Sequence, residues 1–262
     1  MRREPIVLFD NGTHQCMMFD DLVTGDGVQS NQFLITDHEQ YLLLDPGGDL
    51  TYTPLSLELS KRIDLQELTY IFASHQDPDI IASLDKWLLH TRAKVICSKL
   101  WARFLPHLTA NYLAISHGIS TYDRIIALPD AGQAIPLGRS LLKAVPAHFL
   151  HSVGNFQIYD PVSKILFSGD MGASMVDDAS PVRDFTAHIP HMEGFHRRYM
   201  ASNKACRLWA QMVRGIPDLE MIVPQHGQPF VGKAMVGAFL DWIEKLECGI
   251  DLMGPNDYRI PK

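Results

Sequence analysis

Residues 68–89, LTYIFASHQDPDIIASLDKWLL, decide the fold because they predict a strand, a polar loop and a helix in direct succession. The short apolar run at 70–72 predicts a buried strand. From residue 78 onward, a proline and an aspartate open a pattern of apolar residues at helical spacing. The loop between these two elements carries one histidine and two aspartates, whose side chains can bind a metal ion.

The loop places His75, Asp77 and Asp79 two residues apart. In an extended segment alternate side chains point to the same side, so these three donors can face one point. One imidazole and two carboxylates in that arrangement can bind a divalent cation. The alternative is that Asp77 or Asp79 only caps the following helix, and the loop taken alone fits capping slightly better than metal binding.

The composition is that of an ordinary soluble globular protein, with 262 residues, 46% hydrophobic and 20% charged. A chain of this length forms one large domain or two small ones and has a full core available. The net charge of −7 disfavours binding to nucleic acid or to an anionic membrane surface. No apolar run approaches the roughly 18 residues of a membrane helix. We therefore expect no membrane partner, and the negative charge predicts no nucleic-acid partner.

The cysteines also indicate where the protein works. Cys16, Cys97, Cys206 and Cys248 are scattered and form no CxxC motif. In a chain of this size, such cysteines are typical of buried thiols in a reducing compartment. The N-terminal apolar run is too short for a signal peptide. Both observations predict a cytoplasmic protein.

The rest of the chain alternates between short strands and helices. Strands are expected at 6–9, 15–19, 32–36, 41–44, 94–97, 125–128, 134–137, 141–145, 156–159, 164–167 and 220–223. Helices are expected at 55–63 with Thr53 as cap and Pro54 first, at 100–113 with a bend at Pro106, at 191–213 and at 231–246. Residues 171–189 lack periodicity and predict a long loop. Strands dominate both halves and both contribute helices, which predicts an α+β fold: an αββα sandwich in one domain over residues 1–262.

Three further residues of metal-ligand type stand just beyond predicted strands. His151 lies in a loop between two strands, Asp170 ends the phrase LFSGD, and His226 lies in PQHG, where Gly227 permits a tight turn. Active sites of layered α/β folds collect at strand ends. Each residue alone fits an ordinary turn, but together with the first loop they predict a binuclear metal site.

The order HxDxD, His, LFSGD and PQHG resembles the metallo-β-lactamase superfamily, and within it the di-iron domain of flavodiiron proteins. The resemblance covers nearly the whole chain. The segment QFLIT…YLLLDPGG resembles the opening strands of the superfamily and places Asp45 near the metals. Carried over by position, the resemblance implies six metal ligands: His75, Asp77, Asp79, His151, Asp170 and His226.

Two positions depart from the flavodiiron pattern. Asp77 stands where those proteins have glutamate, and Ile80 stands where they have a histidine ligand. No flavodoxin-like domain follows before Lys262, so we expect no flavin in this chain. This combination resembles the oxygen-binding di-iron proteins linked to bacterial chemotaxis and redox sensing.

The resemblance also implies how the ligands are divided. One metal takes His75, Asp77 and His151, the other takes Asp79 and His226, and Asp170 bridges the two. Because Ile80 cannot coordinate, the second metal keeps open positions for water or dioxygen. A set of imidazoles and carboxylates without thiolate suits iron or manganese, and the resemblance implies two iron ions.

The expected function is the binding of dioxygen as a peroxo adduct by an oxygen sensor or carrier, with a chemotaxis or other signalling protein as partner. We also consider a homodimer. Turnover is not expected, because nothing in the chain delivers further electrons; if it occurs, the protein is an oxidoreductase. Two alternatives stay open: an oxygen or nitric oxide reductase with a separate electron donor, and a metal-dependent hydrolase of the same fold.

Two other residues are assigned to the surroundings of the pocket. His148 lies three residues before His151, so on a straight strand the two face opposite sides, and His148 is not expected to be a ligand. Tyr199 shares a helix face with His196 and could roof the pocket, although a surface helix explains both residues equally well.

Overall fold

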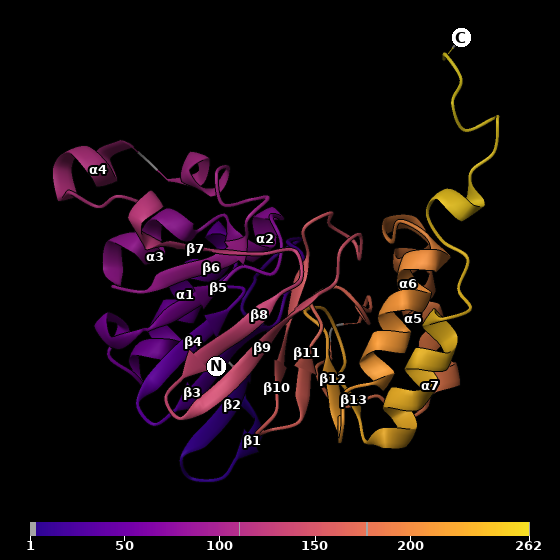
Figure 1. Cartoon of the computed structure of the whole chain (residues 1–262), viewed down its shortest axis with the longest axis horizontal. Coiled ribbons are helices and arrows are strands. Elements are labelled where there is room, and N and C mark those ends of the chain that lie inside the picture. Colours follow the sequence, from indigo (N-terminus) through magenta and orange to yellow (C-terminus); the bar gives the residue numbers. More distant parts are fainter. Residues whose placement is uncertain (1–3, 110, 177, 262) are drawn as a thin grey trace.

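Two β-sheets lie face to face in the computed structural model, with helices on both outer sides (Figure 1). The structure describes residues 4–109, 111–176 and 178–261. Helices α1 to α4 lie on the side of the first sheet, and α5 to α7 lie on the side of the second. Their bounds are α1 Asp49–Ser60, α2 Pro78–Ile81, α3 Leu84–His90, α4 Asn111–His117, α5 Phe185–Tyr199, α6 Asn203–Arg214 and α7 Lys233–Ile243. The predicted αββα sandwich is confirmed.

The first sheet has seven strands in the order of the sequence. These are β1 Ile6–Asp10, β2 His14–Phe19, β3 Gln32–Asp37, β4 Gln40–Leu44, β5 Tyr70–Phe72, β6 Lys94–Ser98 and β7 Ile125–Leu128. The strands β1 to β4 are antiparallel, whereas β4 to β7 run parallel. Parallel neighbours need long crossover connections, and the segment containing α1 supplies the first of them.

The second sheet has six strands in the order β13-β12-β11-β10-β9-β8. They are β8 Gln133–Leu137, β9 Ser140–Pro146, β10 Phe156–Asp160, β11 Ile165–Phe167, β12 Met221–Val223 and β13 Phe230–Val231. Only β11 and β12 are parallel, and α5 and α6 lie in the connection between them. The ends of β11 and β12 therefore lie side by side at one edge of the sandwich.

The core between the sheets is apolar and draws on both of them. The rings of Phe33 in β3 and Phe167 in β11 lie 4.9 Å apart, and both side chains are buried. Ile35, Leu142 and Ile158 belong to the same cluster. Burial of such side chains stabilises the fold by roughly 1.5–3 kcal/mol for each one. This packing fixes the relative position of the strand ends on which the predicted site depends.

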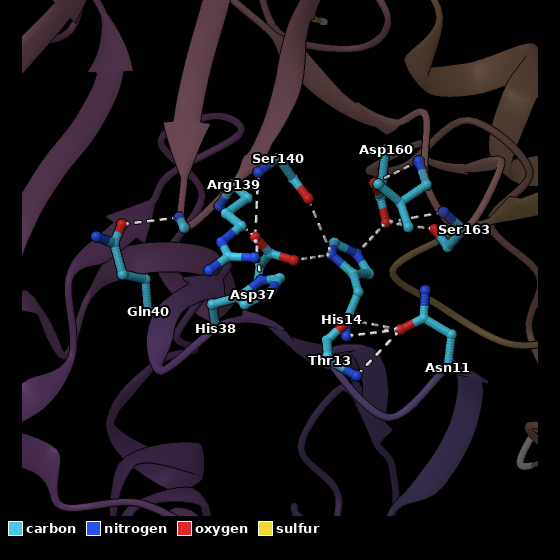
Figure 2. A network of polar contacts seen from close by, with 12 residues as sticks. Asn11, Thr13, His14, Asp37, His38, Gln40, Arg139, Ser140, Asp160 and Ser163 are labelled. Carbon is cyan, nitrogen blue, oxygen red and sulfur yellow. Dashed lines mark hydrogen bonds and ion pairs between the residues drawn. The ribbon is translucent and has the colours of Figure 1, made fainter.

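A buried polar network also joins the two sheets, at His14 of β2 (Figure 2). Its Nδ1 lies 3.1 Å from Oδ1 of Asp37 in β3, and its Nε2 lies 2.7 Å from Oδ2 of Asp160 in β10. Burial acts to lower the pKa of His14, but the hydrogen bonds and charges of Asp160 and Asp37 raise it overall. The Cys16 thiol donates to the same Asp160 carboxylate. These contacts join the two sheets through one imidazole.

Helix α1 begins earlier than predicted. The sequence placed its start at Pro54 with Thr53 as cap, but the helix begins at Asp49, and the carbonyl of Gly48 accepts from the amides of Thr51 and Tyr52. Pro54 lies inside the helix, where its missing N–H leaves the carbonyl of Leu50 without its helical donor. Because Leu50 is exposed, water can satisfy that carbonyl.

The single helix predicted at 191–213 is wrong, because the chain forms α5 and α6 with a break between them. Met200 and Ser202 have extended backbone, and the Ser202 hydroxyl caps α6 by accepting from the amide of Ala205. Helix α5 begins at Phe185, where the Asp184 carboxylate accepts from the amide of Ala187. The predicted loop at 171–189 therefore ends at residue 184.

Three other helices are shorter than predicted. The helix that opens at Pro78 breaks after Ile81, because Ala82 and Ser83 separate α2 from α3 and the Ser83 hydroxyl donates to the carbonyl of Gly47. The segment 100–113 forms turns and a 3₁₀ helix at Leu105–Leu108 before α4, and residue 110 lies outside the described residues. The segment 231–246 begins with the end of β13, and α7 covers only its middle.

Candidate metal centre

The six predicted ligands lie together at one edge of the sandwich. His75 and Asp77 follow β5, and Asp79 is in the first turn of α2. His151 lies between β9 and β10, Asp170 follows β11 and His226 follows β12. Since β11 and β12 are parallel neighbours, their ends bring Asp170 and His226 to the same place. Strand topology thus gathers side chains that are up to 151 positions apart in the sequence.

Four of the six form one group around a common point. Nε2 of His151 lies 3.2 Å from Oδ2 of Asp77 and 2.9 Å from Oδ2 of Asp170. Nε2 of His75 lies 3.7 Å and 3.5 Å from the same two oxygens. All four donor atoms lie within 4.8 Å of one another. Ligands that bind one ion at about 2.0–2.2 Å have such separations, so this group can hold a metal.

The other two ligands form a second group with the far oxygen of Asp170. Nε2 of His226 lies 3.5 Å from Oδ2 of Asp79 and 3.5 Å from Oδ1 of Asp170. The Asp170 carboxylate therefore presents Oδ2 to one group and Oδ1 to the other. A carboxylate between two donor groups is the arrangement that two-metal sites require, with the ions about 3.5–4 Å apart.

Two of the imidazoles are held by a hydrogen bond at the ring nitrogen that faces away from the centre. Nδ1 of His75 lies 2.9 Å from Oγ of Ser74, and Nδ1 of His226 donates to the carbonyl of Gln29 at 2.6 Å. These bonds leave Nε2 of both rings pointing to the centre. Metal-binding histidines usually have such a partner, which fixes the ring and its tautomer.

Neither Ser74 nor Gln29 was predicted from the sequence to support the site. The role of Ser74 could have been predicted from the sequence, because a hydroxyl directly before a ligand histidine can reach the ring of that histidine. The role of Gln29 could not, because its backbone carbonyl contacts a ring 197 positions later. The Gln29 side chain is itself bound to the main chain of Val23, which fixes this loop.

Two buried polar atoms of the centre test whether a cation fits. Nε2 of His75 and Oδ1 of Asp170 are buried and have no hydrogen-bond partner among the described residues. A buried polar atom without a partner costs about 1–3 kcal/mol, so such atoms need an explanation. Both atoms face the space between the donor groups, where a cation would satisfy them. The residues present therefore fit a binuclear metal site.

The charges of the centre favour a cation as well. Burial acts to raise the pKa of Asp170, but the imidazoles of His75, His151 and His226 outweigh it and hold the pKa well below its usual range. Burial acts to lower the pKa of His151, but the carboxylates of Asp170 and Asp77 raise it to about 10. The point between these carboxylates therefore attracts positive charge strongly.

Asp45 supports this arrangement from behind. Its Oδ1 accepts from the backbone amide of Ser74 at 2.7 Å, and its side chain is fully buried. Burial raises the pKa of Asp45 to about 8. The expected position near the metals agrees with this contact, since Ser74 in turn holds the His75 ring.

Ile80 and His148 do not add donors to the centre. Ile80 is completely buried in the cluster between the first sheet and its helices, where it packs with Leu43 and Ile71. Nε2 of His148 donates to the carbonyl of Asp130 in the turn after β7. The position that carries a histidine ligand in flavodiiron proteins is thus part of the apolar core here.

Aromatic rings of helix α5 lie against one of the predicted ligands, His151. The rings of Tyr199 and His151 lie 5.6 Å apart, and Phe195 stacks on Tyr199 at 4.8 Å. His196 of the same helix is buried, and its Nε2 accepts from the amide of Gly172, two residues beyond Asp170. The i, i+4 spacing of Phe195 and Tyr199 in the sequence already places both rings on one face of a helix.

The fold and the donor set define a metallo-β-lactamase-like protein. The family described as "ODP family beta lactamase" matches residues 28–227, and the chain belongs to this family. This family match confirms the predicted resemblance to the oxygen-binding di-iron proteins.

Two solved structures of the chemotaxis sensor ODP are similar over almost their whole length. Its peroxy diiron species is 40% identical, with a TM-score of 0.82, covering 94% of this chain and 97% of that chain. The apo state from T. denticola is 39% identical, with a TM-score of 0.81, covering 95% of this chain and 96% of that chain.

More distant relatives share less. The Flv1 flavodiiron core from Synechocystis sp. PCC6803 is 18% identical, with a TM-score of 0.74, covering 94% of this chain and 62% of that chain. At this identity the likeness shows the fold alone. The uncharacterized protein MJ0732 of Methanocaldococcus jannaschii is 30% identical over 208 residues, which are 77% of this chain and 49% of that protein. The chain therefore spans about half the length of this curated relative.

Proposed function

We propose that this chain is a non-haem di-iron protein that binds dioxygen and acts as an oxygen sensor in bacterial chemotaxis or redox signalling. The observation that carries the proposal is the position of Asp170, whose two oxygens face separate donor groups. The similarity to the peroxy diiron species of a chemotaxis sensor supports dioxygen as the ligand.

His75, Asp77 and His151 would hold one iron, Asp79 and His226 would hold the other, and the Asp170 carboxylate would be shared between them. A pair of ferrous ions supplies the electrons that dioxygen needs to bind as a reduced species. Imidazole and carboxylate donors without thiolate suit iron. Ile80 is buried in the apolar core and offers no donor atom, so an ion beside Asp79 and His226 would have fewer protein ligands and room for a diatomic molecule.

The chain's own residues orient and shield the site. Ser74 and the Gln29 carbonyl hold the rings of His75 and His226, so that Nε2 of each ring faces the ions. Tyr199 and Phe195 lie against the His151 ring, whose side chain is only 15% exposed to water. Limited access favours a stable dioxygen complex, because protons from solvent promote further reduction.

The wider setting is part of the proposal. Residues 1–262 form one di-iron domain, which transmits the state of the centre to a chemotaxis or signalling protein. The four cysteines are free thiols, which supports a cytoplasmic location. No helix within the described residues is long and apolar enough to cross a membrane.

Titration of the anaerobic, iron-loaded protein with dioxygen tests this function. We expect a new absorption band that persists after dioxygen is added, while an oxygen electrode records no continuous consumption in the presence of a reductant. Rapid and continuous consumption would instead identify a reductase. Two tightly bound zinc ions with hydrolytic activity, and no spectral response to dioxygen, would identify a hydrolase.

The matched control for this titration is His148→Gln. His148 is a histidine close to His151 in sequence, but its ring donates to the Asp130 carbonyl. The variant should bind iron and dioxygen as the wild type does. His151→Gln should lose the spectral response, so the pair separates the role of the centre from a general effect of histidine removal.

A further inference from the structure

Two of the four cysteines lie in contact although they come from distant parts of the chain. Sγ of Cys206 in α6 lies 3.8 Å from Sγ of Cys248, which follows α7. Both residues are completely buried, and both thiols are free. Cys16 in β2 and Cys97 in β6 belong to two other core clusters. The pair is separate from the metal ligands, and the proposed function does not use it.

We propose that Cys206 and Cys248 are a modification site, a thiol pair that hydrogen peroxide oxidises to an intramolecular disulfide. The two sulfur atoms must approach from 3.8 Å to about 2.05 Å. The connection between α7 and Cys248 is short and irregular, so it can adjust by that amount more easily than two packed helices could. The two sulfur atoms are therefore close together, and the segment that carries Cys248 can move toward Cys206.

The surroundings assign the order of the two steps. Cys248 lies in the irregular segment after α7, whereas Cys206 is held within α6, so local opening exposes Cys248 first. The hydrogen bond between the two thiols lowers the pKa of Cys248, although burial and the charge of Asp251 oppose it, and raises the pKa of Cys206. Cys248 is therefore the sulfur that peroxide reaches first, and it reacts as the thiolate because only the thiolate is nucleophilic. Cys206 is the thiol that resolves the intermediate.

The reaction balances with one peroxide molecule. The Cys248 thiolate attacks one peroxide oxygen, the O–O bond breaks, and a sulfenic acid and hydroxide form. The Cys206 sulfur then attacks the sulfenic sulfur, so that the S–S bond forms, the S–O bond breaks and a second hydroxide leaves. The protons of the two thiols convert both hydroxides to water. The thiols lose two electrons, and the peroxide gains them.

Access to the buried pair comes from the segment that covers it. The amides of Gly249 and Ile250 donate to the carbonyls of Arg197 and Ala201, and Ile250 itself is exposed. In Figure 1 this segment, in yellow, leaves α7 and runs beside α5 and α6. The side-chain amide of Asn203 in α6 also donates to the carbonyls of Glu244 and Leu246, and its backbone amide donates to the Asp251 carboxylate. Local opening of this segment breaks these contacts and exposes the sulfurs without unfolding the sandwich.

A disulfide at this place would fix the turn between α5 and α6. Ser202 in that turn forms a β-bridge with Gly249, and the Ala201 amide donates to the carbonyl of Phe149, two residues before His151. Tyr199, at the end of α5, lies against the ring of His151. The thiol pair is thus connected through one turn to an aromatic ring beside the proposed metal centre.

The test is peroxide treatment of the full chain after iron has been removed with a chelator, so that it does not depend on the metal centre. The thiol count after denaturation should fall from four to two, and a non-reduced digest should contain a peptide that links Cys206 to Cys248. In the oxidised protein, the amides of Gly249 and Ile250 should exchange at least about tenfold more slowly.

Variants make the result specific. Cys16→Ser/Cys97→Ser should still form the linked peptide, and Cys206→Ser should accumulate a sulfenic acid on Cys248 that dimedone traps. Circular dichroism verifies that each protein is folded. A thiol count that stays at four would overturn the proposal, and so would oxidation of Cys16 and Cys97 without the linked peptide. Neither result would bear on dioxygen binding, which is measured on the iron-loaded protein.

Discussion

Oδ2 of Asp170 lies 2.9 Å from Nε2 of His151, and this is the shortest contact between proposed ligands of the centre. The other oxygen of the same carboxylate lies 3.5 Å from His226 and has no hydrogen-bond partner among the described residues. One side chain therefore belongs to both donor groups. Its position at the end of β11, beside the end of β12, is a direct result of the parallel pairing of these strands.

Asp170→Asn should weaken the binding of both irons. The amide keeps the size of the carboxylate but removes the negative charge and one strong acceptor. We expect affinity to fall by more than about 100-fold, beyond the 10–100-fold that is typical for residues that only support ligands. Anaerobic equilibrium dialysis against ferrous iron measures this. Iron binding equal to the wild type would contradict the bridging role, and His148→Gln should bind normally.

Ser74→Ala should weaken iron binding less, by about 10–100-fold, because the His75 ring loses the partner at Nδ1 but keeps its ligand atom. The control is Ser60→Ala, which removes an exposed hydroxyl that donates to a carbonyl within α1. Competition with a coloured chelator gives both affinities. If the two alanine variants bind iron alike, Ser74 does not position the ring.

Ile80→Ala should lower stability and leave iron content unchanged. The side chain is completely buried in the core cluster, and truncation of such a residue costs about 2–5 kcal/mol. Urea unfolding of the metal-free proteins measures the loss. A variant that is as stable as the wild type but has lost iron would show that Ile80 acts in the centre rather than in the core.

The His14 network predicts a pH-dependent contribution to stability. The pKa of His14 is raised in the folded protein, and those of Asp37 and Asp160 are lowered. The histidine contribution is therefore complete below its unfolded pKa of about 6.5 and is lost as pH rises through its higher folded value. The aspartate contributions are lost only in acid, below their ordinary pKa.

Thermal unfolding of the wild type and of His14→Gln between pH 5.5 and 9.5 measures this effect. Asp37, Asp160, the neutral Cys16 thiol and Ser140 are the polar groups that face the ring, and none of the four is expected to change charge over this range. The advantage of the wild type should be largest near pH 5.5 and should shrink as pH rises. A constant difference would show that the imidazole is not charged in the network.

The sequence predicted the strands well because each is a short apolar run bounded by turn residues, as at Tyr70–Phe72 before the His75 loop. The candidate ligands could be identified for the same reason, since they follow those runs. Helix limits were harder to predict. The apolar spacing of α5 continues into α6, and only the tertiary position of Met200 and the cap at Ser202 separate them.

Contacts made through the main chain could not be predicted at all. The Gln29 carbonyl orients the ring of His226, which lies 197 positions later in the sequence, and the glutamine side chain takes no part in that hydrogen bond. The contact between Cys206 and Cys248 likewise depends on how α6 and the segment after α7 pack. The cysteine spacing alone gave no reason to pair them.

The most direct measurement for the central claim is the number of ferrous ions that the anaerobic protein binds, determined by titration together with the dioxygen that the loaded protein then takes up. The account predicts two irons for each chain and one dioxygen for each pair of irons, with both values reduced in Asp170→Asn. A single ion per chain, or two ions whose presence leaves dioxygen unbound, would contradict it.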